Sequence, residues 1–174
     1  SAPSKFYTLS PTAEPGSAAA GYSVAVGPVS LPAMVDRPQM VVRLAPNEVS
    51  IDEFNRWASP LPDSIARVVA GNLASMLGTP YVSVFPEPTA LGARYRVVVD
   101  VMVFDSALGE AAALDAVWTV RQTKDGPSRA GRTTASEAVK EKGYPALVAA
   151  HSRALEKLSA DIAGAIQTLE RGAR

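Results

Sequence analysis

The stretch Arg56-Trp57-Ala58-Ser59-Pro60-Leu61-Pro62 decides how this chain folds. Its two prolines keep the backbone extended immediately before the expected start of a helix. The short polar side chain of Asp63 or Ser64 can cap this helix, because its oxygen can accept a hydrogen bond from a first-turn N–H. We therefore predict that the chain turns a corner at Trp57 and that a helix begins at residue 63.

The helix that follows the corner is strongly amphipathic. Its apolar residues recur at helical spacing and form one stripe, which is broken only by Asn72. The stripe consists of Ile65, Val68, Val69, Asn72, Leu73, Met76 and Leu77. Gly78 is well placed to end the helix, and Pro80 prevents its continuation. The pattern predicts a helix over residues 63–77 that lies on an apolar surface.

Short apolar segments before the corner predict strands. Phe6–Leu9 and Tyr22–Val26 are β-prone, and residues 10–21 between them have the Pro-, Gly- and Ser-rich composition of a loop or flexible linker. Residues 40–54 alternate on both sides of a turn at 45–48, which predicts a hairpin. This hairpin would deliver the chain to the corner.

Strands also dominate the sequence after the first helix. Tyr81–Phe85 is a strand candidate, and residues 94–136 predict a three-stranded antiparallel meander. The first strand of the meander, Tyr95–Phe104, carries apolar side chains on both faces, which predicts a central position in the sheet. Pro145 suits the first turn of a long last helix, whose apolar stripe ends at Leu169.

This order of elements predicts an α+β fold, in which a mostly antiparallel sheet carries two main helices packed on one face. We expect residues 6–170 to form a single domain, preceded by an N-terminal tail at residues 1–5. The length of 174 residues and the hydrophobic share of 47% are sufficient for one sizeable core.

Composition excludes several classes of function. The 17 basic and 17 acidic residues cancel, which argues against a nucleic-acid partner. The chain has no cysteine, so disulfides, thiol catalysis and thiolate metal sites are excluded. No apolar run approaches the ~20 residues that a membrane-spanning helix needs.

Candidate catalytic groups are few. His151, the only histidine, lies on the apolar stripe of the last helix without a nucleophile signature, which favours a half-buried packing role. Asp100, Asp105, Glu110 and Asp115 gather in the meander, where acidic residues next to a turn are usually solvated. We predict no enzyme activity and no catalytic, cofactor-binding or metal-binding residue. An active site built on His151 or these carboxylates is the competing hypothesis.

The corner has two interpretations. Trp57 either packs in the core or, beside Arg56 and Leu61, forms the centre of an interface. Flanking prolines would lower the entropy cost of binding. The candidate partner or oligomer interface consists of Arg43, Arg56, Trp57, Pro60 and Leu61. Arg43, Arg56 and Arg67 would either form a small anion site or pair at the surface with carboxylates and carbonyls.

Several segments together carry a resemblance to a known family. They are Phe6–Leu9, Val26–Pro32, Asp36–Arg43 and Arg56–Leu61, with Leu147–Ala150 and Leu155–Ile162 in the last helix. In these segments the chain resembles the PqiC family of ABC-transport auxiliary lipoproteins, which is associated with mammalian-cell-entry (MCE) lipid transport systems of Gram-negative bacteria. The resemblance extends from Tyr7 to Ile166. His151 departs from the family pattern, in which an apolar residue is more typical.

The resemblance implies a lipoprotein that is not an enzyme. Its acylated cysteine would stand just before Ser1, after a removed signal peptide, and would anchor the protein to the outer membrane in the periplasm. The implied partner is an inner-membrane MCE-domain protein that bridges the envelope. We expect the chain to dock this protein, as a homo-oligomer and without a cofactor.

The alternative function is a periplasmic carrier of a lipid or small ligand. The many alanines of both helices would leave room for an acyl chain in a cleft between sheet and helices. Close packing of the two helices is the competing explanation of the same alanines.

Overall fold

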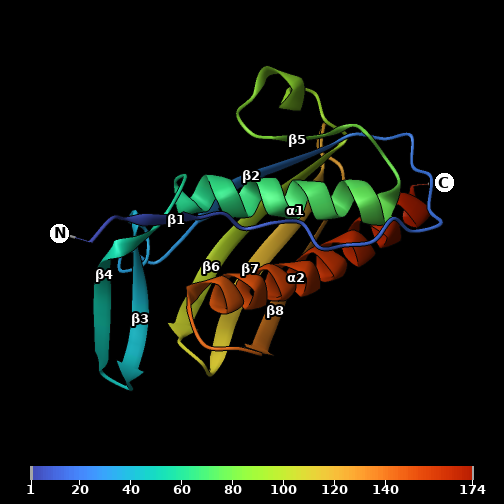
Figure 1. Ribbon diagram of the computed structural model, residues 1–174. Coiled ribbons are helices and arrows are strands. Elements are labelled where there is room, and N and C mark those ends of the chain that lie inside the picture. Colours follow the sequence, from blue (N-terminus) through green and yellow to red (C-terminus); the bar gives the residue numbers. More distant parts are fainter. Residues whose placement is uncertain (1, 174) are drawn as a thin grey trace.

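Two sheets and two long helices make up the fold (Figure 1). The computed structural model describes residues 2–173. The strands are β1 (Lys5–Tyr7), β2 (Val24–Ser30), β3 (Gln39–Ala45), β4 (Glu48–Trp57), β5 (Val82–Val84), β6 (Tyr95–Ala107), β7 (Ala111–Gln122) and β8 (Ser128–Ala138). The helices are α1 (Leu61–Leu77) and α2 (Tyr144–Gly172), with a short 3-10 helix η1 (Pro88–Ala90).

The two sheets are mixed. A five-stranded sheet has the order β5-β2-β6-β7-β8, and a three-stranded sheet has the order β1-β4-β3. The predicted antiparallel meander (β6, β7, β8) and hairpin (β3, β4) are confirmed. However, β2 runs parallel to both β5 and β6, and β1 runs parallel to β4. The α+β class is therefore confirmed, whereas the largely antiparallel strands form two mixed sheets and not one sheet.

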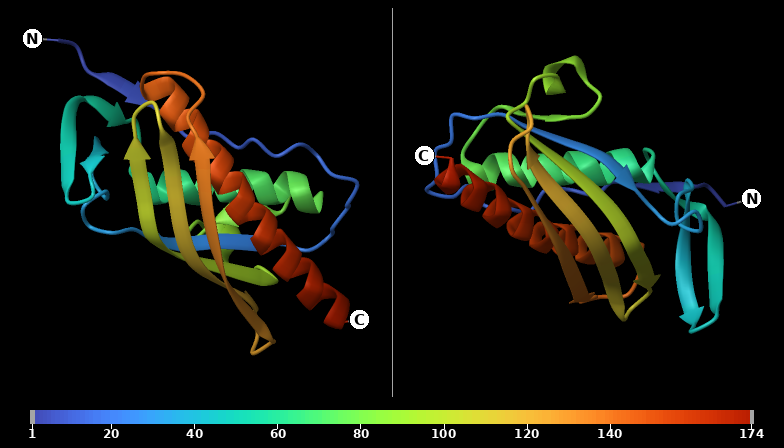
Figure 2. Two further views of the ribbon diagram at one scale, coloured as in Figure 1. Left: turned by 90° about the horizontal axis from the view of Figure 1, so that it is seen from below. Right: turned by 180° about the vertical axis from the view of Figure 1, so that it is seen from behind.

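Both helices lie on the same face of the five-stranded sheet, and the other face is uncovered (Figure 2). α1 contacts β2 and β5, α2 contacts β7 and β8, and the helices also contact each other. Side chains from the two helical stripes and from β2, β6 and β7 form the core. The apolar stripes that predict the helices are thus buried between helix and sheet.

The start of α1 differs from the prediction. The helix begins at Leu61, two residues before Asp63, and its N-cap residue Pro60 makes no side-chain capping bond. The prediction of a side-chain cap was wrong because Pro62 fits the first turn, where a missing N–H costs no helical hydrogen bond. Gly78 ends the helix in the left-handed conformation (φ 65°), as predicted.

β6 is the central strand, as predicted, but only one of its faces is buried. Tyr95, Val97 and Val99 are fully buried toward the helices, whereas Val98 and Met102 are 39% and 53% exposed on the uncovered face. A register shift between Val101 and Val103 then changes which residues point inward. Phe104 is buried for this reason.

The segment between β1 and β2 is the predicted loop, and it runs alongside α1 (Figure 1). The backbone N–H of Gly16 donates to the carbonyl of Ser75 (3.2 Å), and that of Ala20 donates to the carbonyl of Leu77 (3.0 Å). These bonds use carbonyls of the last helical turn, which have no partner within a helix. The segment is therefore part of the folded layer and not a flexible linker.

Asn72, the residue that breaks the apolar stripe of α1, is fully buried. Its Oδ1 accepts hydrogen bonds from the backbone N–H groups of Thr12 and Ala13, both at 3.1 Å. Its Nδ2 donates to Oγ of Ser159 on α2 (3.1 Å), and that hydroxyl donates to the carbonyl of Leu155. One amide thus joins the N-terminal segment, α1 and α2.

We expect Asn72→Leu to lower the free energy of unfolding by about 3 kcal/mol, because it removes the acceptor of two backbone N–H groups and the donor to the buried hydroxyl of Ser159. Urea denaturation at neutral pH measures this change. Ser75→Ala is the matched control on the same helix, because it keeps the backbone carbonyl that holds Gly16. An Asn72→Leu variant as stable as the control would contradict this account.

Gly131 on β8 lies directly opposite Trp118 on β7. A Cβ atom at Gly131 would lie 2.3 Å from Cζ2 of Trp118. The indole cannot easily move away, because its Nε1 donates to Oγ1 of Thr133 (3.0 Å), which in turn donates to Asp161 on α2 (2.7 Å). The glycine is thus required by the position of the tryptophan ring.

Gly131→Ala is expected to cost about 1–3 kcal/mol of stability through this overlap. Gly164→Ala on α2 is the control, since apart from its chain neighbours and the backbone of its own helix no atom lies within 4 Å of the added Cβ. That control should gain about 0.5–1 kcal/mol, because alanine favours a helix over glycine. Thermal melts of the two variants should move in opposite directions, and equal melting temperatures would refute the steric argument.

Candidate functional site

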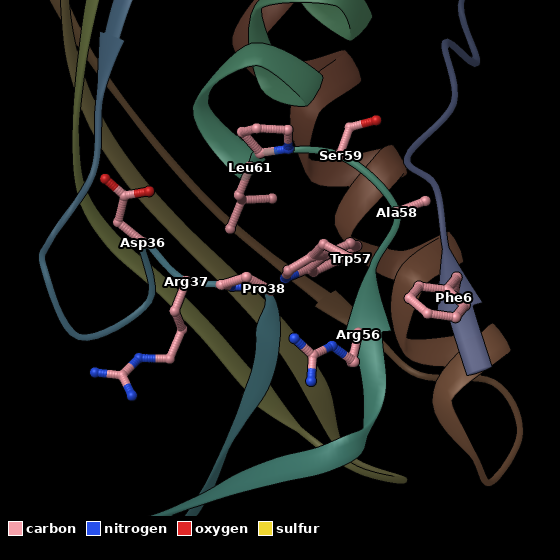
Figure 3. Close-up of a pocket in the computed structure, with 10 residues that line it drawn as sticks. Phe6, Asp36, Arg37, Pro38, Arg56, Trp57, Ala58, Ser59 and Leu61 are labelled. Carbon is pink, nitrogen blue, oxygen red and sulfur yellow. The ribbon is translucent and has the colours of Figure 1, made fainter. Parts of the chain in front are cut away.

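The Arg56–Leu61 corner borders a surface pocket with a volume of about 360 Å³, which we call the corner pocket (Figure 3). Three segments that are distant in sequence form it: β1, the loop before β3, and the corner itself. The lining residues are Phe6, Asp36, Arg37, Pro38, Arg56, Trp57, Ala58, Ser59, Pro60 and Leu61.

Backbone hydrogen bonds hold these segments together. The N–H of Trp57 donates to the carbonyl of Pro38 (2.8 Å), and the N–H of Ala58 donates to the carbonyl of Tyr7 (2.9 Å). Phe6 pairs with Arg56 in the parallel register of β1 and β4, so both side chains lie on the same face of that sheet. The end of β4 is therefore fixed from both sides.

Trp57 belongs to the core. Its side chain is only 6% exposed, and its ring meets those of Phe104 (6.3 Å between centroids) and His151 (6.5 Å) at steep angles. The structure thus supports the core interpretation, while the same ring forms the inner wall of the corner pocket. Leu61, 1% exposed, lies beside it in the wall and starts α1.

A polar cluster fixes β4 against the start of α2. The hydroxyl of Tyr144 donates to Oδ2 of Asp52 (2.6 Å), and the rings of Tyr144 and Tyr7 stack with 6.0 Å between centroids. Burial and the neighbouring carboxylate raise the pKa of Tyr144. Burial works to raise the pKa of Asp52, but hydrogen bonds from Tyr144, Phe54 and Asn55 outweigh it and lower that pKa. These contacts keep the pocket wall in one position.

The mouth of the pocket combines an aromatic ring with two cations. Phe6 is 63% exposed, and Figure 3 shows it on the opposite side of the pocket from Arg37. Nε of Arg37 donates to the carbonyl of Met34 (3.0 Å), and within residues 2–173 no ion pair engages its guanidinium. Arg56 has only a loose contact with Glu53 (3.8 Å). An apolar wall with partly unengaged charges is suited to binding a protein surface.

The pocket contains every predicted interface residue except Arg43. Nη2 of Arg43 contacts Oδ1 of Asp105 at 3.3 Å, away from the corner. Arg67 contacts Asp63 and Glu87 on α1 and near η1. The three arginines Arg43, Arg56 and Arg67 therefore pair with carboxylates at the surface, and the structure does not bring them together as an anion site.

Sequence reasoning missed Phe6, Arg37 and Pro38 as lining residues. β1 has only three residues and joins β4 through a parallel pairing that no local pattern reveals. Segments 6–9 and 36–43 do share the family resemblance with the corner, and this common feature was the available signal. Patterns within single segments carried no information that these residues meet.

His151 is completely buried, more deeply than the predicted half-buried position, and it packs in the core. Its ring stacks on Phe104 with 4.0 Å between centroids, and Nε2 shares a hydrogen bond with Oγ of Ser106 (2.7 Å). Nδ1 has no partner within residues 2–173, so no acid orients the imidazole as in a catalytic triad. Burial lowers the pKa of His151 to about 3.

Three of the four predicted meander carboxylates are engaged in separate contacts, and the fourth, Glu110, is exposed. Asp115 forms a double hydrogen bond with Arg132 (2.8 and 2.6 Å), which lowers the pKa of Asp115. Asp105 contacts Arg43, and Asp100 accepts a hydrogen bond from Ser30. In the described part of the chain, no three His, Asp or Glu side chains are grouped to hold a metal ion.

The fold and the site define a class of protein: an α+β domain with a partly apolar surface pocket and a buried histidine that packs in the core. Residues 7–163 match the family described as the ABC-type transport auxiliary lipoprotein component, and the chain belongs to this family. The resemblance inferred from the sequence is thereby confirmed.

Two solved structures share this fold. Protein XCC0632 from Xanthomonas campestris, a DUF330 protein, is 18% identical with a TM-score of 0.79, covering 98% of this chain and 100% of that one. An uncharacterised protein is 22% identical with a TM-score of 0.77, covering 95% and 99%. No curated protein matches the chain. Among residues 2–173, no helix is long and apolar enough to cross a membrane.

The pH dependence of stability tests the environment of His151. The unfolded chain has the ordinary histidine pKa of 6.5, whereas the folded pKa is about 3, so the unfolded state takes up the proton first as the pH falls. Stability present above pH 6.5 is then lost toward pH 3. Between pH 6.5 and 4.5, wild type should lose about 2–3 kcal/mol more than His151→Leu. Parallel urea titrations of the two proteins would show equal losses if His151 were solvated.

Proposed function

We propose that this chain is a non-catalytic lipoprotein component of an MCE-type intermembrane lipid transport system. In this proposal it docks the periplasm-spanning MCE protein at the outer membrane. Membership of the auxiliary lipoprotein family supports a role in a transport assembly. The observation that carries the docking role is the corner pocket, which combines a fixed apolar wall with the exposed ring of Phe6.

The position of β1 relates the pocket to the membrane anchor. The predicted acylated cysteine before Ser1, and Ser1 itself, lie outside the described residues. If the acylated cysteine directly precedes Ser1, as the resemblance implies, six residue steps separate it from Phe6, and an extended chain of that length spans at most about 22 Å. Because Phe6 lines the pocket, such an anchor holds the pocket within this distance of the outer membrane. The end of the MCE conduit would then meet the lipoprotein close to the lipid surface.

The proposed partner is accordingly the inner-membrane MCE-domain protein, and we propose that the chain assembles as a homo-oligomer in the periplasm. The second candidate function, a carrier of a lipid or small ligand, has less support. The alanines Ala66, Ala70, Ala150 and Ala154 are buried, and Asn72 contacts Ser159 directly between the helices. This supports close helix packing, which leaves little room for an acyl chain between the two helices.

The docking role is tested by Phe6→Ser, because this side chain is exposed and can change without opening the core. Trp57→Ala is unsuitable, since removing a buried indole destabilises the protein by about 3–5 kcal/mol. Binding of the purified MCE-domain protein to the immobilised chain should weaken about tenfold or more in Phe6→Ser, as expected for an aromatic interface residue.

Leu91→Ser is the matched control, because Leu91 is 74% exposed and lies beside η1, outside the corner pocket. It should bind the MCE-domain protein like wild type. Circular dichroism should show that both variants remain folded. Equal affinities of Phe6→Ser and wild type would remove the corner pocket from the docking surface.

A further inference from the structure

β8 is a long edge strand. It pairs with β7 over all of its 11 residues without a register shift, and no described strand pairs with its other side. The other edge of this sheet, β5, has only three residues. Natural proteins usually shorten, bend or block such edges, because an open edge pairs with other chains. β8 contains neither proline nor lysine.

Two backbone hydrogen bonds, one at each end of β8, fix the direction of the backbone groups of this strand. The N–H of Gln122 donates to the carbonyl of Pro127, and the N–H of Val139 donates to the carbonyl of Glu110. On the β8 side, the partners in these two bonds are Pro127 and Val139, which directly flank the strand and are both odd-numbered. The odd-numbered residues therefore direct their backbone groups toward β7. Since hydrogen-bonded and non-bonded pairs alternate in an antiparallel ladder, the even-numbered residues direct their N–H and C=O groups outward.

The side chains next to these outward groups are compatible with a further strand. Apart from Arg132 they are small, and all are exposed: Ser128, Ala130, Arg132, Thr134, Ser136 and Ala138. Arg132 already forms its double hydrogen bond with Asp115 across the sheet. Of the outward carbonyls, that of Ala138 accepts a bond from Arg153 (2.9 Å). Within residues 2–173, the remaining outward backbone groups have no hydrogen-bond partner.

We propose that β8 pairs with β8 of a second copy of this chain, antiparallel and about a two-fold axis at Thr133. This register pairs Ser128 with Ala138 of the second copy and therefore uses the full length of both strands. Outward groups then meet outward groups, for example those of Ala130 and Ser136. The two five-stranded sheets become one continuous sheet, as in other cases of strand addition.

Charge complementarity supports this register over its neighbours. The two-fold at Thr133 places Arg129 directly opposite Glu137 of the second copy, twice in the dimer. Both residues are odd-numbered and lie on the face of the sheet that carries α2, where Glu137 contacts Arg153 (3.7 Å). Arg129 is exposed, and within residues 2–173 it has no ion pair. Directly opposed pairs of unlike charge stabilise a sheet by about 0.2–1 kcal/mol each.

This inference rests on the homo-oligomer part of the proposed function and specifies its interface. It is independent of the docking role, because β8 contributes no residue to the corner pocket. The two surfaces can therefore be tested separately in the same protein.

Cysteine cross-linking tests the register directly, because the chain has no native cysteine. In the double variant Ala130→Cys/Ser136→Cys, the new residues form hydrogen-bonded pairs between copies, with Cα atoms about 5.5 Å apart. This separation suits a disulfide. Within one copy the two positions are about 20 Å apart along the strand, so no disulfide forms inside a single chain.

Mild oxidation of the whole protein should give a covalent dimer of Ala130→Cys/Ser136→Cys on a non-reducing gel. Ala130→Cys alone and the out-of-register pair Ala130→Cys/Ala138→Cys are the controls, and each should give at least tenfold less dimer. A product confined to monomer, or equal yields from all three variants, would overturn the proposed register.

A charge exchange supplies a second readout. Arg129→Glu should raise the dissociation constant of the dimer several-fold, and Arg129→Glu/Glu137→Arg should restore it, as measured by analytical ultracentrifugation. Absence of rescue counts against the Arg129–Glu137 pairing. An oligomer in native mass spectrometry without in-register cross-linking would keep the homo-oligomer and refute the β8 interface. A strictly monomeric protein would refute the homo-oligomer as well as the β8 interface, and it would leave the Phe6→Ser docking test unaffected.

Discussion

The arrangement of the whole helical layer depends on the buried amide of Asn72. An unpaired amide in an apolar core costs several kcal/mol, so this side chain can be buried only if each of its hydrogen-bonding groups has a partner. Those partners are the backbone of residues 12 and 13 on one side and Ser159 of α2 on the other. The amide therefore specifies where the N-terminal segment and both helices meet, which apolar packing alone leaves less well defined.

The corner pocket follows from this arrangement. The N-terminal segment continues backward into β1, which supplies Phe6 to the pocket mouth. β1 is short, but two contacts of Tyr7 hold it in place. The Ala58–Tyr7 backbone bond joins it to the end of β4, and the stacking of Tyr7 on Tyr144 joins it to the start of α2. The pocket thus joins three segments: the pairing of β3 with β4 brings the loop before β3 against the corner, and the N-terminal segment adds β1 beside β4. The contacts that hold these segments in the fold therefore also set the shape of the pocket.

The helices and strands could be predicted from the sequence better than the way in which they pair and pack. Amphipathic spacing identified α1 and α2, and alternation identified the meander and the hairpin, because these signals are local. The parallel pairings of β1 with β4 and of β2 with β6 escaped prediction, since alternation does not depend on the direction of a neighbouring strand. Asn72 was visible only as an interruption of a stripe. Its partners lie far away in sequence and left no local signal.

The same distinction applies to the site. The prolines and Trp57 marked the corner, and four predicted residues line the pocket, whereas Arg43 lies elsewhere because the hairpin carries it toward Asp105. Whether Trp57 is core or surface depends on Phe104 and His151, which arrive from β6 and α2. A pattern within one segment contains no information about which residues of other elements pack against it. Phe6, Arg37 and Pro38 come from other segments, so no pattern within the corner could indicate that they line the same pocket.

The distribution of polar partners is consistent with the proposed role in assembly. Buried polar side chains such as Asn72, Ser159 and Thr133 are engaged in hydrogen bonds that hold elements together. The Ser106–His151 pair is likewise buried in the core. Arg37 at the pocket and Arg129 at the β8 edge, in contrast, are at the surface without an ion pair within residues 2–173. A carboxylate of another chain can pair with these two arginines without first breaking an ion pair. The corner pocket and the β8 edge are therefore the surfaces at which we expect another chain to bind.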